Sequence, residues 1–271
     1  MQDYIRTNKE AWEEAFDRRL PGWGDDNAKR LLSEKLPFFA PAVQEELEAL
    51  SLQGKSVAQF CCNNGRELLS LVKFGAGDGT GFDIAANILG QARETARRAG
   101  IANCTFVEGN LLDIPTSFHG RFDFVFFTVG ALTWFEDLGP VFRKAADCMK
   151  PGGALLIHDI HPYMSMLPAP GEAAFDPQRL DRFTYPYFRK APWLETDGMG
   201  YIAGTYQSKL FTSFSHTVSH LLTRLMESGF ALTKFLEFDT DVGLTDVYDG
   251  KGLPLSYLLT ARLERKGPSP A

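Results

Sequence analysis

The residues best suited to chemistry in this sequence lie in one short turn and in an aspartate that follows it. The turn, FCCNNGRE, completes the apolar run SVAQF and contains small cysteines, two asparagines and a glycine. Asn and Gly tolerate positive φ better than other residues, so the backbone of this turn can come close to a ligand. Asp83 ends the next apolar run, about twenty residues downstream, where a carboxylate commonly binds ribose hydroxyls. Together these features predict a cofactor site.

Histidines are the second set of candidates, for proton transfer. His161 lies in an HPY turn just beyond the fifth apolar run, where a substrate should meet the cofactor, and we expect it to act as a base or to position the substrate. His158 lies within that run and is expected to be packed. His216 and His220 have the i, i+4 spacing of two ligands on one helix face. No Glu lies between them and no third ligand is evident, so no metal site is predicted.

The elements that must position these residues alternate short apolar runs with amphipathic stretches from Lys55 onward, which is typical of βαβ units. Five runs are expected to form strands, followed by a helix that ends at Gly229 and by two final strands. The first five runs are SVAQF, TGFDI, CTFVE, FDFVFFT and ALLIHDI, and the final two are FALTKFLEFD and LPLSYLLTARLE. The predicted fold class is α/β, with a doubly wound, mostly parallel seven-stranded sheet.

Changes in composition along the chain predict its organisation. The N-terminal stretch is polar and helical in pattern, whereas the segment after Asp159 is rich in Pro and aromatic residues and longer than an ordinary connection. Within that segment, YIAGTYQSKLFTSFSH alternates like a pair of short strands. We therefore predict an N-terminal helical cap over 1–50, a core over 51–160 and 216–265, a lid or substrate insertion over 161–215, and a flexible tail over 266–271.

Composition narrows the class of partner. The formal net charge of -6 argues against nucleic acid or an anionic membrane as the main partner, because phosphate binding relies on clustered Lys and Arg. No stretch approaches the roughly 20 apolar residues that span a bilayer, and acidic residues near the start are unlike a signal peptide. The four cysteines lack the spacing of a disulfide framework. We expect a cytoplasmic protein that acts on a small molecule, and the sequence leaves open whether it forms a homodimer.

Five segments in order resemble the class I S-adenosylmethionine-dependent methyltransferases, within a bacterial group whose first loop is a Cys/Asn variant. The segments are VAQFCCNNG, GFDIA, VEGNLLDIP, FDFVFFTVGALTWFED and MKPGGALLIHD. The resemblance covers most of 56–160 and continues weakly to Gly229 and Phe230. It implies the Rossmann-like methyltransferase fold, with S-adenosylmethionine as the cofactor and S-adenosylhomocysteine as its product.

The resemblance also implies which residues form the site. Its cofactor residues would be Tyr4, Trp12, Phe60, Cys61, Cys62, Asn64, Gly65, Asp83, Ile84, Asn110, Leu111 and Thr128. His216 stands where relatives have a substrate-facing residue and joins His161 as a candidate catalytic residue. Two departures stand out: Gln59 replaces an acidic residue that orients the methionine amino group in many relatives, and Asn110 replaces the usual Asp. Cys61 and Cys62 are expected to be small buried residues, without thiol chemistry.

The function that follows is methyl transfer from S-adenosylmethionine to an oxygen or nitrogen of a small aromatic or amphipathic molecule. Aromatic residues concentrate in 163–206, where some are expected to wall the acceptor pocket. Two alternatives remain open. A protein that binds ligands on the same fold but has lost turnover would fit the missing glycines and Gln59. A nicotinamide-dependent oxidoreductase is less favoured, because the sequence has no G-x-G-x-x-G run.

Overall fold

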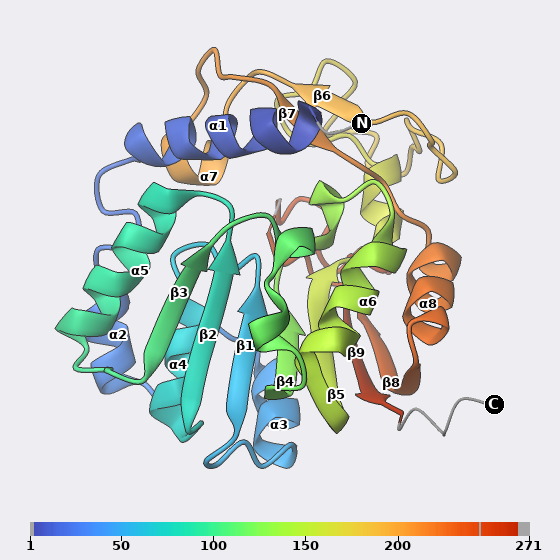
Figure 1. Ribbon diagram of the computed structural model, residues 1–271. Coiled ribbons are helices and arrows are strands. Elements are labelled where there is room, and N and C mark those ends of the chain that lie inside the picture. The colour runs from blue at the N-terminus through green and yellow to red at the C-terminus, as the bar shows by residue number, and fades with distance from the viewer. Residues whose placement is uncertain (1–2, 244, 265–271) are drawn as a thin grey trace.

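Residues 3–243 and 245–264 are described in a computed structural model of the chain (Figure 1). Its centre is a seven-stranded sheet, which confirms the predicted fold class. The strands are β1 (Ser56–Phe60), β2 (Asp78–Asp83), β3 (Cys104–Glu108), β4 (Phe122–Phe127), β5 (Met149–Ile160), β8 (Phe230–Phe238) and β9 (Ser256–Leu263). Their order is β3-β2-β1-β4-β5-β9-β8, and β9 runs antiparallel to the other six strands.

The inner strands are apolar on both sides because helices cover both faces of the sheet. In β4, Phe124 and Phe126 enter one hydrophobic core, whereas Val125 and Phe127 enter the other. β5 begins at Met149, earlier than the predicted run, and its pairing with β4 shifts register between Phe122 and Phe124. The alternation of side chains thus divides one strand between two cores.

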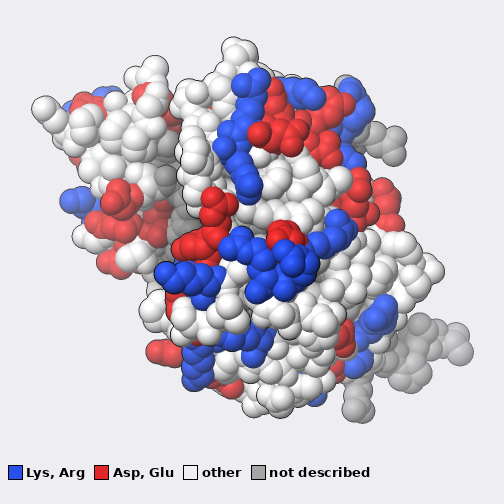
Figure 2. Space-filling view, turned by 90° about the vertical axis from the view of Figure 1, so that its left-hand side faces the viewer, with Lys and Arg blue, Asp and Glu red and all other residues white. Residues whose placement is uncertain are grey.

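Helices fill both layers. On one face lie α2 (Asn27–Ser33), α3 (Pro41–Ala49), α4 (Arg66–Phe74) and α5 (Ala86–Arg98), and on the other lie α6 (Leu138–Cys148) and α8 (Val218–Glu227). Figure 2 views the molecule from the side of α5 and α2 and shows basic and acidic side chains next to one another. Two of the ion pairs are Arg97–Glu94 on α5 and Arg30–Glu34 after α2. This face carries mixed charge.

One helix and a small two-stranded sheet lie above the carboxyl ends of the strands (Figure 1). They are α1 (Asp3–Asp17), β6 (Trp193–Glu195) and β7 (Phe211–Ser213), and β6 pairs antiparallel with β7. The sequence predicts two strands over 201–216, but Gly200–Ala203 forms the short helix α7, so the partner of β7 comes from earlier in the chain. Within 1–50, α1 covers the strand ends, whereas α2 and α3 pack on a sheet face.

Two further observations concern the C-terminal tail and the possibility of a membrane-spanning helix. The predicted tail over 266–271 lies outside the described residues. Among the residues that are described, no helix is both long enough and apolar enough to cross a bilayer.

Candidate functional site

A cavity of about 750 Å³ opens at the carboxyl ends of β1, β2, β4 and β5. Pockets for small molecules commonly measure about 300–1,000 Å³, and open α/β sheets bind ligands at this edge. α1 contributes Tyr4, Ile5, Asn8 and Trp12 to the roof, and the segment after β5 contributes the opposite wall. The cavity therefore lies between the sheet and the elements above it.

The turn after β1 follows the wall of this cavity in an unusual backbone conformation. Cys61, Asn63 and Gly65 have φ values of 57°, 50° and 69°. The turn is held in place by backbone bonds, since the Cys62 N–H donates to Phe82 O and the Gly65 N–H donates to Cys62 O. Left-handed conformations in Cys and Asn cost free energy, so the surrounding contacts must maintain them. The segment FCCNNG therefore forms a tight turn beside the cavity, although it contains only one glycine.

Small residues are required where this turn packs against the sheet. A Cβ on Gly65 would lie 2.5 Å from the Phe106 ring, and a Cβ on Gly81 would lie 2.7 Å from Cys62 Sγ. Both approaches are shorter than van der Waals contact. Cys62 therefore fills the limited space beside Gly81 in the core, which explains a small apolar side chain at this position.

Asp83 joins the end of β2 to the turn. Its Oδ2 accepts a hydrogen bond from the Asn63 N–H at 2.8 Å, and its Oδ1 accepts one from the Ala85 N–H at 3.1 Å. Burial raises the pKa of Asp83, and these backbone donors act in the opposite direction. The carboxylate lines the cavity while it holds two loops.

Gln59 occupies the position where many relatives have an acid, and its carboxamide is used inside the protein. The side-chain amide donates to Thr128 Oγ1 at 2.8 Å, and its Oε1 accepts the Leu68 N–H at 3.2 Å. The first bond joins β1 to the end of β4, and the second satisfies an N–H in the first turn of α4. Gln59 is fully buried, so its role is to connect three elements below the cavity.

Asn110 is likewise committed to local structure. Its Oδ1 accepts the Leu112 N–H at 3.2 Å and its amide donates to Asp113 Oδ2 at 3.0 Å, which caps the short helix Leu111–Asp113. Asn110 and Leu111 both line the cavity. The loop after β3 therefore borders the cavity with the start of a short helix that Asn110 caps.

The structure brings most of the predicted site residues together around the cavity. Those that line it are Tyr4, Trp12, Cys61, Asn64, Asp83, Ile84, Asn110, Leu111, Thr128, His161 and His216. Phe60, Cys62 and Gly65 do not line it: Phe60 and Cys62 are fully buried in the two cores, and Gly65 packs on Phe106. The alternation of β1 explains Phe60, because successive side chains point to opposite faces of the sheet.

His161 has a hydrogen bond at Nδ1, whereas its Nε2 lies near an acidic side chain without a hydrogen bond. Its Nδ1 accepts the Tyr163 N–H at 3.1 Å and caps the short helix Pro162–Met166, and its Nε2 lies 3.0 Å from Glu237 Oε1. Burial lowers the pKa of His161, although the neighbouring Glu237 acts to raise it. This is the geometry of a capping residue at the edge of the cavity.

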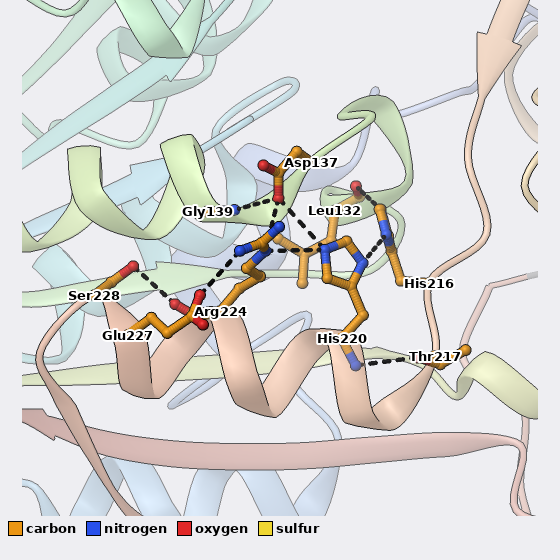
Figure 3. Close-up of polar contacts among 9 residues, drawn as sticks. All are labelled: Leu132, Asp137, Gly139, His216, Thr217, His220, Arg224, Glu227 and Ser228. Carbon is orange, nitrogen blue, oxygen red and sulfur yellow. Dashed lines mark hydrogen bonds and ion pairs between the residues drawn. The ribbon is translucent and has the colours of Figure 1, made fainter.

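His216 belongs to a chain of polar contacts that runs from the cavity wall to the surface between α6 and α8 (Figure 3). Its Nε2 is 3.3 Å from Leu132 O, and its Nδ1 is 3.2 Å from Nδ1 of His220. Asp137 continues the chain, since its Oδ1 lies 3.4 Å from His220 Nε2 and 3.0 Å from Arg224 Nε.

The carbonyl of Leu132 only accepts hydrogen bonds, so His216 Nε2 must carry the proton and Nδ1 must accept from His220. Burial and then the charge of His220 lower the pKa of His216 to about 4. His216 is therefore a neutral imidazole that joins the loop after β7 to the loop after β4.

Three polar residues at the cavity were not predicted as functional. They are His158 and Asp159 at the end of β5 and Tyr257 on β9, and each is at most 6% exposed. Asp159 and Tyr257 are paired in register across the two strands. The sequence contains the HDI segment, but a polar pair inside an apolar run does not reveal which side chain faces a ligand. That information depends on the neighbouring strand.

Comparison with known proteins agrees with this geometry. Residues 57–153 match the family described as Methyltransferase domain. A demethylmenaquinone methyltransferase from Listeria welshimeri is 27% identical over 157 residues, which cover 56% of this chain and 64% of the relative. The chain thus spans less than two thirds of the length of that relative.

Solved structures share the fold at low identity. An S-adenosylmethionine-dependent methyltransferase from Mesorhizobium loti has a TM-score of 0.59 at 22% identity, covering 82% of this chain and 98% of that one. The [4+2]-cyclase SpnF has a TM-score of 0.54 at 15% identity, covering 82% of this chain and 81% of that one. One fold therefore serves different reactions. Residues 57–153 are thus similar to a methyltransferase domain, and the strand order of the sheet is consistent with the fold of the S-adenosylmethionine-dependent methyltransferases.

Proposed function

We propose that this protein transfers the methyl group of S-adenosylmethionine to an oxygen or nitrogen of a small aromatic or amphipathic molecule. The observation that carries the proposal is the continuity of the cavity, which joins the turn after β1 and Asp83 to the aromatic segment after β5. A cofactor and an acceptor bound in one enclosed space can be held in line, which is the main requirement for this displacement.

The charge of the cavity fits a sulfonium ligand. Among the described residues that line it, five are carboxylates and Arg66 is the only Lys or Arg; the carboxylates are Glu67, Asp83, Asp159, Glu172 and Glu195. Arg66 is paired with Glu67 at 2.9 Å. When bound, S-adenosylmethionine would supply a methyl group already activated by the positive sulfur. An acidic, partly aromatic cavity attracts that cation.

The residues around the turn would hold the cofactor. Asp83 would accept hydrogen bonds from the ribose hydroxyls, and the loop of Asn110 and Leu111 would lie against the adenine. Tyr4 and Trp12 on α1 would close over it. Since the side chain of Gln59 is already bonded to Thr128 and to Leu68, the methionine amino group would be held by another acceptor, such as a backbone carbonyl.

The far side of the cavity would hold the acceptor. Trp134, Tyr185, Trp193 and Phe214 line it, and Tyr185 packs edge-on against Trp193 with ring centroids 4.8 Å apart. Flat aromatic walls favour an aromatic or amphipathic molecule. His161 and His216 border this side, and because Nδ1 of His161 caps a short helix and both ring nitrogens of His216 bond to the protein, we assign them the positioning of the acceptor-side loops.

Calorimetry with S-adenosylmethionine and S-adenosylhomocysteine tests the cofactor. We expect the wild type to bind both ligands. Asp83→Asn should bind them at least about tenfold more weakly, which is a loss of about 1.4 kcal/mol of binding free energy. Asp78→Asn is the matched control, because Asp78 begins the same strand and bonds Ser56 Oγ at the opposite edge of the sheet.

Turnover is tested by incubation with tritiated methyl donor and metabolite extracts. A labelled small molecule is expected. Binding of both ligands without any labelled product would favour the alternative of a ligand-binding protein on this fold, and absence of binding to either ligand by the wild type would contradict the proposal.

A further inference from the structure

Asp159 lies where an acceptor would meet the methyl group. It occupies the carboxyl end of β5, beside the end of β4, and its side chain lines the cavity although only 5% of the residue is exposed. Its Oδ1 accepts the Gly130 N–H at 2.6 Å and the Ile160 N–H at 2.8 Å. The carboxylate is therefore oriented by backbone donors from both strand ends, as a reacting group must be.

One further polar side chain on the same face of the sheet as Asp159 lines the cavity without a hydrogen-bond partner. Tyr257, its register partner on β9, is 2% exposed, and within the described part of the chain no hydrogen bond joins its hydroxyl. His158 also lines the cavity, but as the residue before Asp159 on β5 it points to the opposite face of the sheet. Buried polar groups are nearly always bonded, so the unbonded hydroxyl of Tyr257 next to Asp159 points to a ligand that completes it.

The predicted catalytic histidines contrast with this arrangement. Nδ1 of His161 already accepts the Tyr163 N–H, and His216 is held between Leu132 O and His220. Both ring nitrogens of His216 are therefore occupied, whereas Nε2 of His161 lies near Glu237 without a hydrogen bond. The two oxygens of Asp159 offer about four lone-pair sites, and the backbone of Gly130, Ile160 and Leu132 occupies three of them, so one remains for a substrate.

We propose that Asp159 is the general base of this site and that Tyr257 positions the acceptor beside it. The inference rests on the proposed methyl transfer. In the step, the acceptor oxygen or nitrogen forms a bond to the methyl carbon, the carbon–sulfur bond breaks and its electron pair stays on sulfur. The proton of the acceptor passes to the carboxylate of Asp159 and then to solvent.

The groups that face Asp159 permit this role. They are Tyr257 from β9 and Cys61 from the turn after β1, and neither carries a positive charge. Burial raises the pKa of Asp159 to about 6, although backbone hydrogen bonds act to lower it. The carboxylate is then ionised at neutral pH and more basic than an ordinary aspartate, which suits a general base.

A base at this position defines the acceptor class. The acceptor must carry a removable proton on the attacking atom, as a hydroxyl or a neutral primary or secondary amine does, whereas a thioether or a neutral tertiary amine needs no base. The hydroxyl of Tyr257 supplies a hydrogen-bonding group for the same polar end of the molecule.

Binding of small probes to the protein loaded with S-adenosylhomocysteine tests this assignment without turnover. Phenol is compared with anisole, and benzylamine with benzyltrimethylammonium, by NMR titration. We expect at least one proton-bearing probe to bind about tenfold more tightly than its methylated counterpart, because only the former can donate to Asp159. Asp159→Asn and Tyr257→Phe are each expected to reduce that preference.

Asp123→Asn is the control, since Asp123 bonds Lys150 and the Ser56 N–H at the opposite edge of the sheet. It should keep the preference of the wild type. A wild type that prefers neither proton-bearing probe, or an Asp159→Asn variant that keeps the preference, would overturn the assignment. Failure to load S-adenosylhomocysteine would instead count against the proposed function itself.

A second readout is the titration of the Asp159 carboxyl carbon by NMR, identified by its absence in Asp159→Asn. A midpoint near 6 supports the assignment, and a midpoint near the ordinary value of 3.8 contradicts it. With an acceptor from the extract assay, Asp159→Asn should lower the methyl-transfer rate by about 10²–10⁴-fold and abolish the fall in rate below pH 6, with unchanged cofactor binding.

Discussion

Asn8 on α1 pairs with the backbone of Thr212 in β7 as a second strand would. Its amide donates to Thr212 O at 2.8 Å, and its Oδ1 accepts the Thr212 N–H at 2.7 Å. Asn8 is 5% exposed, and Trp12, one turn later, packs edge-on against Trp134 and Phe211. Through these contacts the N-terminal helix and the segment after β5 form one roof over the cavity.

Asn8→Ala should loosen this roof. The change leaves two buried backbone groups unpaired, which costs about 1–3 kcal/mol. We expect a lower free energy of unfolding in urea, faster proteolysis of α1 and weaker binding of S-adenosylmethionine. Asn103→Ala, which removes an exposed bond to Gly77 O at the opposite edge of the sheet, should change none of these by a comparable amount. Equal effects of the two variants would contradict the role of Asn8.

The second prediction concerns the coupling between Gln59 and Thr128. Gln59→Leu leaves the Leu68 N–H and the Thr128 hydroxyl without their partner. In a double-mutant cycle with Thr128→Val, measured by urea unfolding, we expect a coupling of about 0.5–3 kcal/mol. If the effects of the two substitutions on the free energy of unfolding are additive, the hydrogen bond between Gln59 and Thr128 contributes nothing to stability. The exposed pair Arg97 and Glu94 serves as a control cycle, with coupling near zero.

Gly65→Ala tests the requirement for a small residue in the turn. The backbone has φ 69° and the new Cβ would lie 2.5 Å from Phe106, so conformational strain and overpacking add. Gly100→Ala isolates the strain alone, since Gly100 has φ 68° and nothing lies within 4 Å of its Cβ position. We expect the melting temperature to fall further for Gly65→Ala. Identical shifts would show that Phe106 moves aside without cost.

The buried carboxylate of Asp159 predicts a pH-dependent gain in stability on its removal. Burial raises its pKa from the ordinary 3.8 to about 6, so between these values the folded protein binds more protons than the unfolded chain. Its contribution to stability is therefore present below pH 3.8 and lost as the pH rises through 6. At pH 7 Asp159→Asn should be more stable than the wild type by about 2–3 kcal/mol.

A substitution of His158 provides a comparison for Asp159→Asn, because the pKa of His158 is shifted in the opposite direction. Burial lowers its pKa from 6.5 to about 4, so its neutral form stabilises the fold above pH 6.5 and that contribution is lost as the pH falls through 4. His158→Gln should flatten the acid side of the stability curve, whereas Asp159→Asn should steepen it. Urea unfolding from pH 4 to 8 distinguishes them, and curves displaced in parallel would contradict both pKa shifts.

Local pattern alone determined much of this protein. Apolar runs separated by turn residues predict the seven strands in order, because a strand buried on both faces needs a continuous apolar stretch. The spacing of the turn and Asp83 follows from one strand, turn and helix, so their meeting at one edge of the sheet could be predicted without a structure. The N-terminal helix α1 and the aromatic segment after β5 are also visible in the sequence as changes in composition.

Only the tertiary structure decided what the polar residues touch. Asn8 and Thr212 are 204 positions apart, and Asp159 meets Tyr257 only because β9 inserts antiparallel beside β5. Nothing local distinguishes Asp159, which accepts hydrogen bonds from the ends of two strands, from His161, whose Nδ1 caps a short helix. The role of a polar side chain depends on which distant donors and acceptors packing brings to it, and those partners are set by the register of the sheet rather than by neighbouring residues.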